Sequence, residues 1–230
     1  MKIIHDTDLL HSKLQQFDIP NLFTCKESIP FELRSYEEEE LVLEEGEQMD
    51  AILFLVEGKV KITSSVQTGK ALLLRFCEPF AIMGDIELIQ KVAVQSQVEA
   101  IERTYCIAVS FTYIYEHLIG DPKFLMSLLT HVTYKLQTCT TASRVNLLAS
   151  VENRFASYLL TTLQEENEFG KEIRTTNTHE IADLIGTTSR HLNRVIIKLS
   201  EQGVVRREGY MIQVVDQNRL AEISQGLRYE

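Results

Sequence analysis

The sequence predicts an α+β protein in three parts: an N-terminal antiparallel β-barrel with a helical arm (1–117), one long helix (118–149) and a C-terminal domain of short helices and a hairpin (150–230). The first part contains short apolar stretches with strand alternation, separated by turn signals, which is typical of a barrel or sandwich. In the second part the apolar period changes to about 3.5 residues. A chain of 230 residues is long enough for two packed cores.

The barrel is predicted from four strand segments. In AILFLVEGKVKITS the apolar residues Leu53, Leu55, Val60 and Ile62 fall at strand spacing, and Glu57-Gly58 predicts a tight bend between two strands. Further strands are expected at 41–46, 71–77 and 104–110. The acidic run 37–40 is interpreted as a solvated surface.

The long helix contains a seam of residues that recur in steps of four and three. Neither Gly nor Pro interrupts the chain between Pro122 and Ala149. An apolar seam that repeats every 3.5 residues is typical of a helix that packs against a partner helix, so we expect a homodimer. The alternative is an amphipathic helix buried against its own barrel. The predicted interface, called the seam below, consists of Leu125, Leu129, Val132, Leu136, Cys139 and Ser143, and Asn146 continues the same spacing.

A helix-turn-helix is predicted within 176–205. Asn177 is expected to cap the first helix, with Glu180 closing a capping box, and Gly186 permits the positive φ of a tight turn. Thr187 or Thr188 caps the second helix. A hairpin is expected at 204–215, with Glu208-Gly209 at its tip. The residues predicted to face inward are Ile181, Ala182, Leu184, Ile185, Leu192, Val195, Ile196 and Leu199.

The outer face of the second helix holds residues that can read base edges. Arg can donate two parallel hydrogen bonds to guanine, and Asn can bond adenine through both ends of its amide. This pattern predicts that the helix enters the major groove of double-stranded DNA, with the hairpin contacting phosphates. The alternative is a helical hairpin with a solvated charged face. The candidate DNA-binding residues are Thr188, Ser189, Arg190, His191, Asn193, Arg194, Lys198, Arg206 and Arg207.

The net charge of −10 disfavours binding to nucleic acid, but the charge is unevenly distributed along the chain. Residues 1–117 carry −10, residues 118–149 carry +2, and residues 150–230 carry −2. Within 186–207, however, five basic residues stand against Glu201 alone. Because a local basic patch is what contacts phosphates, the whole-chain charge weakens only non-specific attraction.

The order of these parts, together with three motifs, resembles the CRP/FNR superfamily of bacterial regulators. The motifs are LEEGEQMDAILFLVEGKVKI (43–62), FAIMGDIELI (80–89) and HEIADLIGTTSRHLNRVIIKLSEQGVV (179–205). The resemblance covers nearly the whole chain. It implies a jelly-roll barrel of the kind that binds cyclic nucleotides, a winged helix-turn-helix, and a dimeric, sequence-specific transcription regulator with an inverted-repeat operator. RNA polymerase is the further expected partner.

Two departures from the superfamily's pattern bear on function. Nucleotide-binding members carry an Arg shortly after a Gly-Glu turn, which pairs with the cyclic phosphate. Here the turn is Gly84-Asp85, Val94 occupies the aligned position, and no Arg occurs between Arg75 and Arg103. A phosphate buried without a guanidinium would be badly desolvated. We therefore expect no cyclic AMP binding, although Lys91 is an alternative point charge. The candidate effector pocket is Gly84, Asp85, Lys91 and Val94.

The second departure lies in the recognition helix. A Glu that is frequent in the superfamily is replaced by Arg190, whereas the Arg four residues later is retained as Arg194. The carboxylate of that Glu can accept a hydrogen bond from cytosine, and Arg190 has no carboxylate. We therefore do not expect this protein to bind the superfamily's standard target sequence.

Other function classes find little support in the residues. A cupin-type enzyme needs His and carboxylate ligands on facing strands, and no His occurs between Leu33 and Ser110. A signalling module with a protein-binding tail is the second alternative, and Arg190, Asn193 and Arg194 favour DNA instead. The six histidines show no ligand spacing. Cys25, Cys77, Cys106 and Cys139 are scattered, which indicates reduced structural thiols rather than an iron–sulfur cluster. With no leader or membrane span visible, we expect a cytoplasmic, non-enzymatic protein without metal or cofactor.

Overall fold

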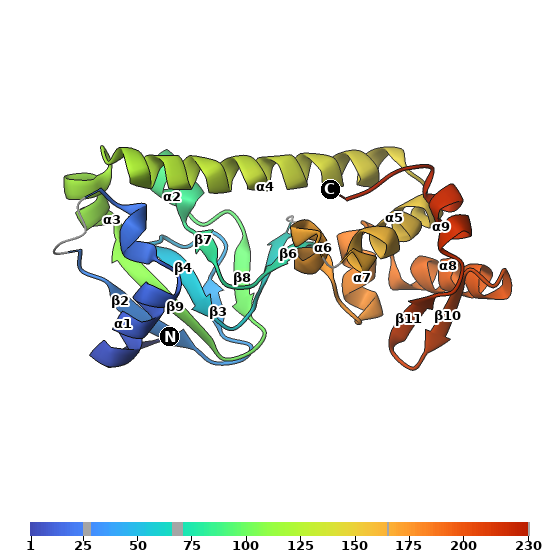
Figure 1. Ribbon diagram of the computed structural model, residues 1–230, viewed down its shortest axis with the longest axis horizontal. Coiled ribbons are helices and arrows are strands. Elements are labelled where there is room, and N and C mark those ends of the chain that lie inside the picture. The colour runs from blue at the N-terminus through green and yellow to red at the C-terminus, as the bar shows by residue number, and fades with distance from the viewer. Residues whose placement is uncertain (25–28, 66–70, 165, 230) are drawn as a thin grey trace. The chain divides into compact units, whose positions relative to one another are not determined.

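The computed structural model describes residues 1–24, 29–65, 71–164 and 166–229, and Cys25 lies outside these ranges. The chain divides into two compact units, Met1–Ser64 with Phe76–Lys135 and Ser65–Arg75 with Leu136–Glu230. The predicted α+β class is confirmed, with antiparallel sheets in the N-terminal part, a long helix, and a C-terminal helix-turn-helix (Figure 1). Among the described residues, no helix is long and apolar enough to cross a membrane.

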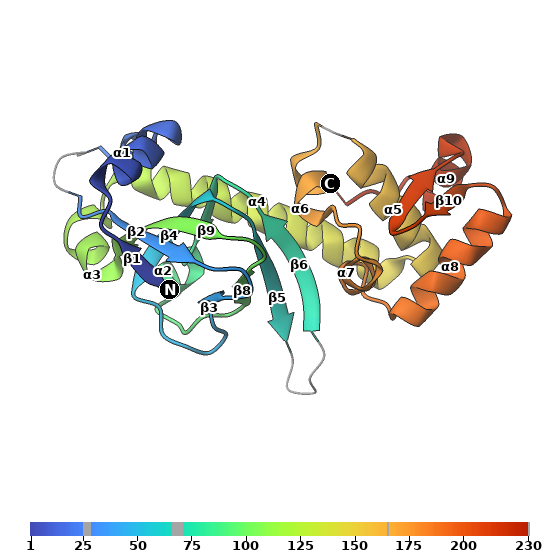
Figure 2. The same cartoon turned by 90° about the horizontal axis from the view of Figure 1, so that it is seen from below.

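Two antiparallel sheets form the barrel (Figure 2). One sheet has the order β1-β2-β9-β4-β7 and the other the order β3-β8-β5-β6. The predicted strand segments are confirmed as β3, β4, β5, β6 and β9, except that β3 ends at Leu43 and residues 44–46 are not in a strand. The strands are β1 (Lys2–Ile4), β2 (Glu32–Tyr36), β3 (Leu41–Leu43), β4 (Ala51–Glu57), β5 (Val60–Ser65), β6 (Ala71–Cys77), β7 (Ala81–Met83), β8 (Gln97–Ala100) and β9 (Thr104–Ser110).

Gly58 makes the predicted bend between β4 and β5. Its φ is +87°, a conformation that residues with a Cβ rarely adopt. A Cβ at this position would also lie 2.6 Å from the carbonyl oxygen of Arg103. Glycine is therefore required here both by backbone conformation and by the close approach of the neighbouring chain.

Strand β4 is buried on both of its faces. Because side chains alternate along a strand, Ile52, Phe54 and Val56 point into one core and Leu53 and Leu55 into the other. The first core lies between a sheet and helices that include α1 (Thr7–Gln16) and the 3-10 turn Ile19–Leu22. The second core fills the space between the two sheets and includes the buried thiols of Cys77 and Cys106. Cys139, in contrast, is exposed.

The helices of the first unit contribute residues to the first core. Helix α2 (Asp85–Gln90) follows β7, and α3 (Phe111–Tyr113) continues into a π-helical turn at Ile114–Leu118. The long helix α4 (Pro122–Leu148) starts in the first unit, where Phe124 and Leu128 are buried in the first core.

Within the second unit, the described helices that follow α4 share buried residues. Both predicted inward faces of the helix-turn-helix are buried, and they pack with side chains such as Phe155 and Leu220. The elements are α5 (Val151–Leu163), α6 (Glu168–Ile173), α7 (Thr178–Leu184), α8 (Ser189–Glu201), β10 (Val205–Glu208), β11 (Met211–Val214) and α9 (Gln217–Ser224).

Asp121 caps the N-terminus of α4. Its Oδ1 accepts hydrogen bonds from the backbone N–H groups of Lys123 at 2.9 Å and Phe124 at 3.2 Å. Its Oδ2 accepts from the backbone N–H of Thr24 at 2.7 Å, and Oδ1 also accepts from the Thr24 hydroxyl. One carboxylate thus satisfies the helix end and ties the N-terminal arm to it.

Replacing Asp121 with Ala is expected to lower the free energy of unfolding at pH 7 by about 1 kcal/mol, the usual cost of losing such a cap. Burial alone would raise the pKa of Asp121, but the bonds from Thr24, Phe124 and Lys123 outweigh it and hold the pKa below its ordinary value. Since the folded pKa is the lower one, this stabilisation is complete above about pH 4 and is lost as the pH falls through the folded value. Urea unfolding at pH 7 and pH 3 measures the difference, with Glu116→Ala as the exposed control. An equal loss in both variants at both pH values would contradict the assignment.

Candidate nucleic-acid interface

The turn between α7 and α8 is held by backbone and side-chain hydrogen bonds. Gly186 has a φ of +62°, and the N–H of Thr187 donates to the carbonyl oxygen of Ala182 at 2.8 Å, the pattern of a Schellman cap. Arg154 of α5 donates from Nη1 to the carbonyl oxygens of Ile185 at 2.7 Å and Gly186 at 3.2 Å. These bonds fix the angle at which α8 leaves the turn.

The caps of the two helices differ in part from the sequence prediction. The side chain of Asn177 accepts from the N–H of His179 at 2.9 Å, so Asn177 is the predicted cap. The capping box is wrong, because the Glu180 carboxylate instead accepts from the Thr175 hydroxyl at 2.5 Å. Of the two candidates for α8, Thr188 is the cap.

The outer face of α8 presents basic side chains to solvent. Arg190, Arg194 and His191 are exposed, and within the part of the chain that the structure describes neither arginine has a hydrogen-bond or ion-pair partner. Ser189 is half-buried and its hydroxyl lies 2.8 Å from Nδ1 of His179 in α7. The arrangement leaves two guanidinium groups available for an external acceptor.

Strands β10 and β11 form the predicted hairpin, but its tip is shifted by one residue. Glu208 pairs with Met211, so the turn is Gly209-Tyr210 rather than Glu208-Gly209. Both Arg206 and Arg207 are exposed on β10. Arg207 donates from Nη1 to Oδ1 of Asn193 at 3.3 Å, which links the hairpin to the outer face of α8.

Lys198 is engaged by a residue outside the predicted motif. Its Nζ lies 2.5 Å from Oε2 of Glu152 in α5. The two residues are separated by 46 positions in sequence, so no local pattern could have indicated the pair. Lys198 is therefore partly neutralised within its own domain.

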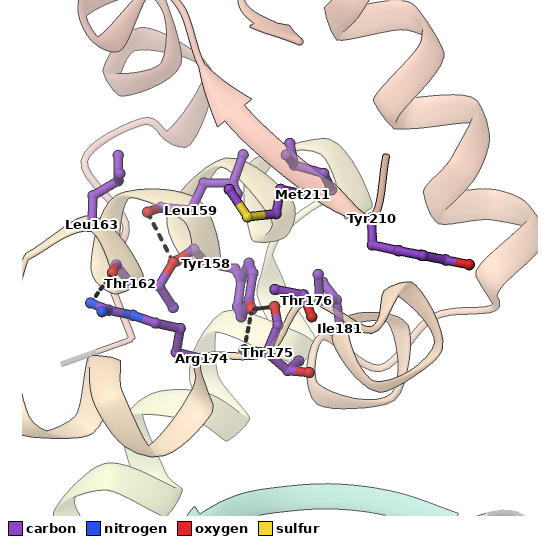
Figure 3. Close-up of a pocket in the computed structure, with 11 residues that line it drawn as sticks. Tyr158, Leu159, Thr162, Leu163, Arg174, Thr175, Thr176, Ile181, Tyr210 and Met211 are labelled. Carbon is purple, nitrogen blue, oxygen red and sulfur yellow. Dashed lines mark hydrogen bonds between the residues drawn. The ribbon is translucent and has the colours of Figure 1, made fainter. Parts of the chain in front are cut away.

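A hollow of about 310 Å³ lies in the same domain, between α5, the chain before α7 and the hairpin (Figure 3). The Tyr158 hydroxyl donates to the carbonyl oxygen of Thr175 and accepts from its N–H, and Arg174 bonds the carbonyl oxygen of Thr162. Burial raises the pKa of Tyr158 to about 12. Because these polar groups are satisfied internally, they hold the chain before α7 against α5. The ring of Tyr210 points away from the hollow (Figure 3).

The candidate effector residues lie in different surroundings within the first unit. Asp85 lines a groove with residues of α4, whereas Lys91 lines a separate one, with its Nζ 4.9 Å from the centre of the Tyr115 ring. Val94 is buried, and its N–H and carbonyl are bonded to the backbone of Glu47 and Gly46. Asp85 is 3 % exposed and is paired with Lys135 of α4.

The seam residues lie on a face of α4 that the described residues of the chain leave largely exposed. Leu129 is 56 % exposed and Leu136 is 64 % exposed, while Leu125, Cys139 and Ser143 are also exposed and Val132 is half-buried. A different stripe, which includes Phe124, Leu128, Thr138, Thr141 and Val145, is buried.

Asn146 does not belong to that exposed face. Its amide donates to the carbonyl oxygen of Leu184 at 3.0 Å, and its Oδ1 accepts from the Tyr229 hydroxyl at 2.6 Å. The last position of the predicted spacing therefore contacts the chain's own C-terminal domain.

Two antiparallel sheets, a long helix and a helix-turn-helix followed by a hairpin together define a protein with an N-terminal barrel domain and a C-terminal DNA-binding domain. The cyclic nucleotide-binding domain family matches residues 33–118, and the Crp-like helix-turn-helix domain family matches residues 153–223. The chain belongs to the CRP/FNR superfamily, and it is a transcription regulator with a helix-turn-helix DNA-binding domain.

Individual relatives agree with this assignment. The regulatory protein YeiL of Escherichia coli O157:H7 is 26% identical over 173 residues, which are 74% of this chain and 76% of the relative. A CRP-like cAMP-activated global transcriptional regulator of Mycobacterium tuberculosis is 24% identical over 184 residues, covering 78% and 82%. A CRP/FNR-family regulator from Thermus thermophilus has the same fold, with a TM-score of 0.65, 22% identity and coverage of 85% and 99%.

Proposed function

We propose that the protein is a dimeric, sequence-specific regulator that binds an inverted-repeat operator through α8. The observation that carries this proposal is the pair of exposed arginines on the outer face of α8, which have no partner among the described residues, whereas Lys171, Lys198 and Arg219 of the same domain are ion-paired. In a two-fold dimer, two such helices enter successive major grooves about 34 Å apart.

Arg194 and Arg190 are the proposed base readers, together with Asn193. They lie in the N-terminal half of α8, the part of a recognition helix that reaches base edges. Ser189 and Thr188 at the helix start, His191, Lys198, Arg206 and Arg207 are assigned to the phosphate backbone, which positions the protein without reading sequence.

Two-fold symmetry is supported by the exposed seam. Large apolar residues repeat along α4, and they remain uncovered although a parallel stripe of the same helix is buried. Exposed apolar surface of this kind is typical of an interface between subunits. An internal helix covered only by its own barrel would not leave this row exposed.

We also propose that the barrel does not bind cyclic AMP. The carboxylate of Asp85, in the place of the superfamily's Glu, is neutralised by Lys135, whose Nζ lies 3.0 Å from Oδ1 and 2.9 Å from Oδ2. Val94 offers no positive charge at the position of the phosphate-pairing Arg. Buried apolar side chains pack between the two sheets.

Replacing Arg194 with Ala should relax the preference for one base position in each half-site, because a bidentate guanine contact contributes about 1–3 kcal/mol. Selection of bound sequences from random duplexes measures the change. Arg206→Ala is the matched control: the loss of a phosphate contact should weaken all sequences alike and reduce the salt slope by about 1. An unchanged sequence logo for Arg194→Ala would remove it from the base readers.

The double variant Val132→Glu, Leu136→Glu should be monomeric, because it places like charges across the proposed contact. Sedimentation velocity measures the oligomeric state at several concentrations. Thr130→Glu with Gln137→Glu adds the same charge on an exposed side of α4 that the seam does not use. A dimer that persists in the seam variant would overturn the assignment.

Calorimetric titration with cyclic AMP should give no binding in the micromolar range. The cAMP-activated relative from Mycobacterium tuberculosis serves as the positive control under the same conditions. A dissociation constant near the micromolar range for this chain would show that Lys91 or another group replaces the missing guanidinium.

A further inference from the structure

A shallow apolar groove of about 370 Å³ lies in the first unit, between α2 and the N-terminal half of α4. Its walls are Ile86 and Ile89 on α2 and Leu125, Leu128, Leu129 and Val132 on α4. Ile89 is 52 % exposed, and Ile86 is exposed as well. Ile86 and Ile89 thus form a continuous apolar patch with the row of apolar side chains on α4. The 3.5-residue period of α4 gave no sign that α2 extends this patch.

A buried ion pair holds α2 in place against α4. Lys135 donates from Nζ to both carboxylate oxygens of Asp85 and, at 2.8 Å, to the carbonyl oxygen of Ile82. A buried charge needs such a partner, because an unpaired one carries a large desolvation penalty. The pair thus fixes how α2 lies on α4. With this attachment in place, Ile86 and Ile89 remain on the outer side of α2.

The heptad positions of the α4 residues indicate which part of a second copy would lie next to the groove. In heptad terms Leu129 and Leu136 are a positions and Leu125 and Val132 are d positions. Leu128 and Lys135, at the g positions, flank the seam on the side of α2, because Leu128 lines the groove and Lys135 bonds Asp85. In a parallel pair of helices, the g side of one lies beside the e side of the other.

Met126 is the apolar residue on the e side. It is 62 % exposed, although it lies between the buried residues Phe124 and Leu128 in sequence. A flexible thioether of this kind fits irregular apolar surfaces. A two-fold axis along the seam brings Met126 of a second copy to the groove of the first, and the same contact repeats on the other side of the axis.

We propose that α2 is part of the dimer contact and that the groove beside Ile86 and Ile89 receives Met126 of a second copy. The proposal rests on the proposed dimer and extends it. The apolar part of the seam ends at Leu136, since Cys139 and Ser143 follow, so the N-terminal half of α4 supplies most of its apolar contact. Helix α2 widens the interface where the seam is apolar. Its attachment through Asp85 makes the barrel a direct participant in dimerisation.

The first test compares charge insertions. Ile89→Glu should raise the dimer dissociation constant at least about tenfold in sedimentation equilibrium, as expected for loss of a central apolar contact. Leu148→Glu is the matched control, because Leu148 is 83 % exposed and occupies an f position of α4, away from the seam. Circular dichroism confirms that both variants are folded. An Ile89→Glu dimer as tight as the Leu148→Glu dimer would overturn the proposal.

The second test detects the contact itself. In a background with Cys25 and Cys139 changed to Ser, an Ile89→Cys chain is mixed with a differently tagged Met126→Cys chain and treated with a short bismaleimide. A cross-linked heterodimer is expected, and none with Leu148→Cys in place of Met126→Cys. If Leu129→Cys chains cross-link to each other while the Ile89–Met126 pair does not, the dimer stands and this inference is wrong. If neither pair reacts, the proposed dimer is wrong as well.

Discussion

Helix α4 carries two rows of apolar side chains, and both rows have to be shielded from water. The packing of the elements around α4 follows from this constraint. Within the first unit Phe124 and Leu128 join the core that the barrel shares with the N-terminal arm. Within the second unit Val145 is buried. The described residues of the chain cover this stripe, but they leave Leu125, Leu129 and Leu136 exposed. A second chain is the natural source of the missing cover, because the exposed row has the spacing of a helix partner. The buried stripe of α4 thus takes part in packing within each unit, and its exposed row supports the proposed dimer.

Charge is distributed so that a chain of net charge −10 can still approach DNA. The acidic excess lies in residues 1–117, which include the barrel, and the exposed arginines lie on α8 and β10. Even within the C-terminal domain the basic groups are partly engaged: Lys198 is paired with Glu152, and Arg207 is bonded to Asn193. Weak non-specific attraction favours discrimination between sequences, since electrostatic contacts to phosphate raise the affinity for every duplex alike.

The sequence predicted those features that depend on local periodicity. Alternation located β4, β5, β6 and β9, and the amphipathic pattern of α8 placed Leu192 and Leu199 inside and Arg194 outside. It did not predict features that depend on contacts distant in sequence. Asp85 and Lys135 are 50 residues apart, and no local spacing connects them. The hairpin tip moved to Gly209-Tyr210 because strand register, rather than the Glu208-Gly209 turn signal, decides which residues pair. The wrong capping box has a similar cause, since Thr175 competes for the carboxylate of Glu180.

The bond between Arg207 and Asn193 joins the hairpin and the recognition helix into one surface. A guanidinium has only N–H donors, so it must face the carbonyl end of the amide. The bond at 3.3 Å therefore fixes the orientation of Asn193, with its NH₂ group directed elsewhere. Adenine recognition requires that the amide carbonyl accept from N6 while the NH₂ donates to N7. The carbonyl oxygen has a second lone pair, and Arg207 leaves it available while it restrains the rotation of the amide. Under the proposed role of Asn193 as a base reader, the hairpin positions this side chain through Arg207 before DNA is bound.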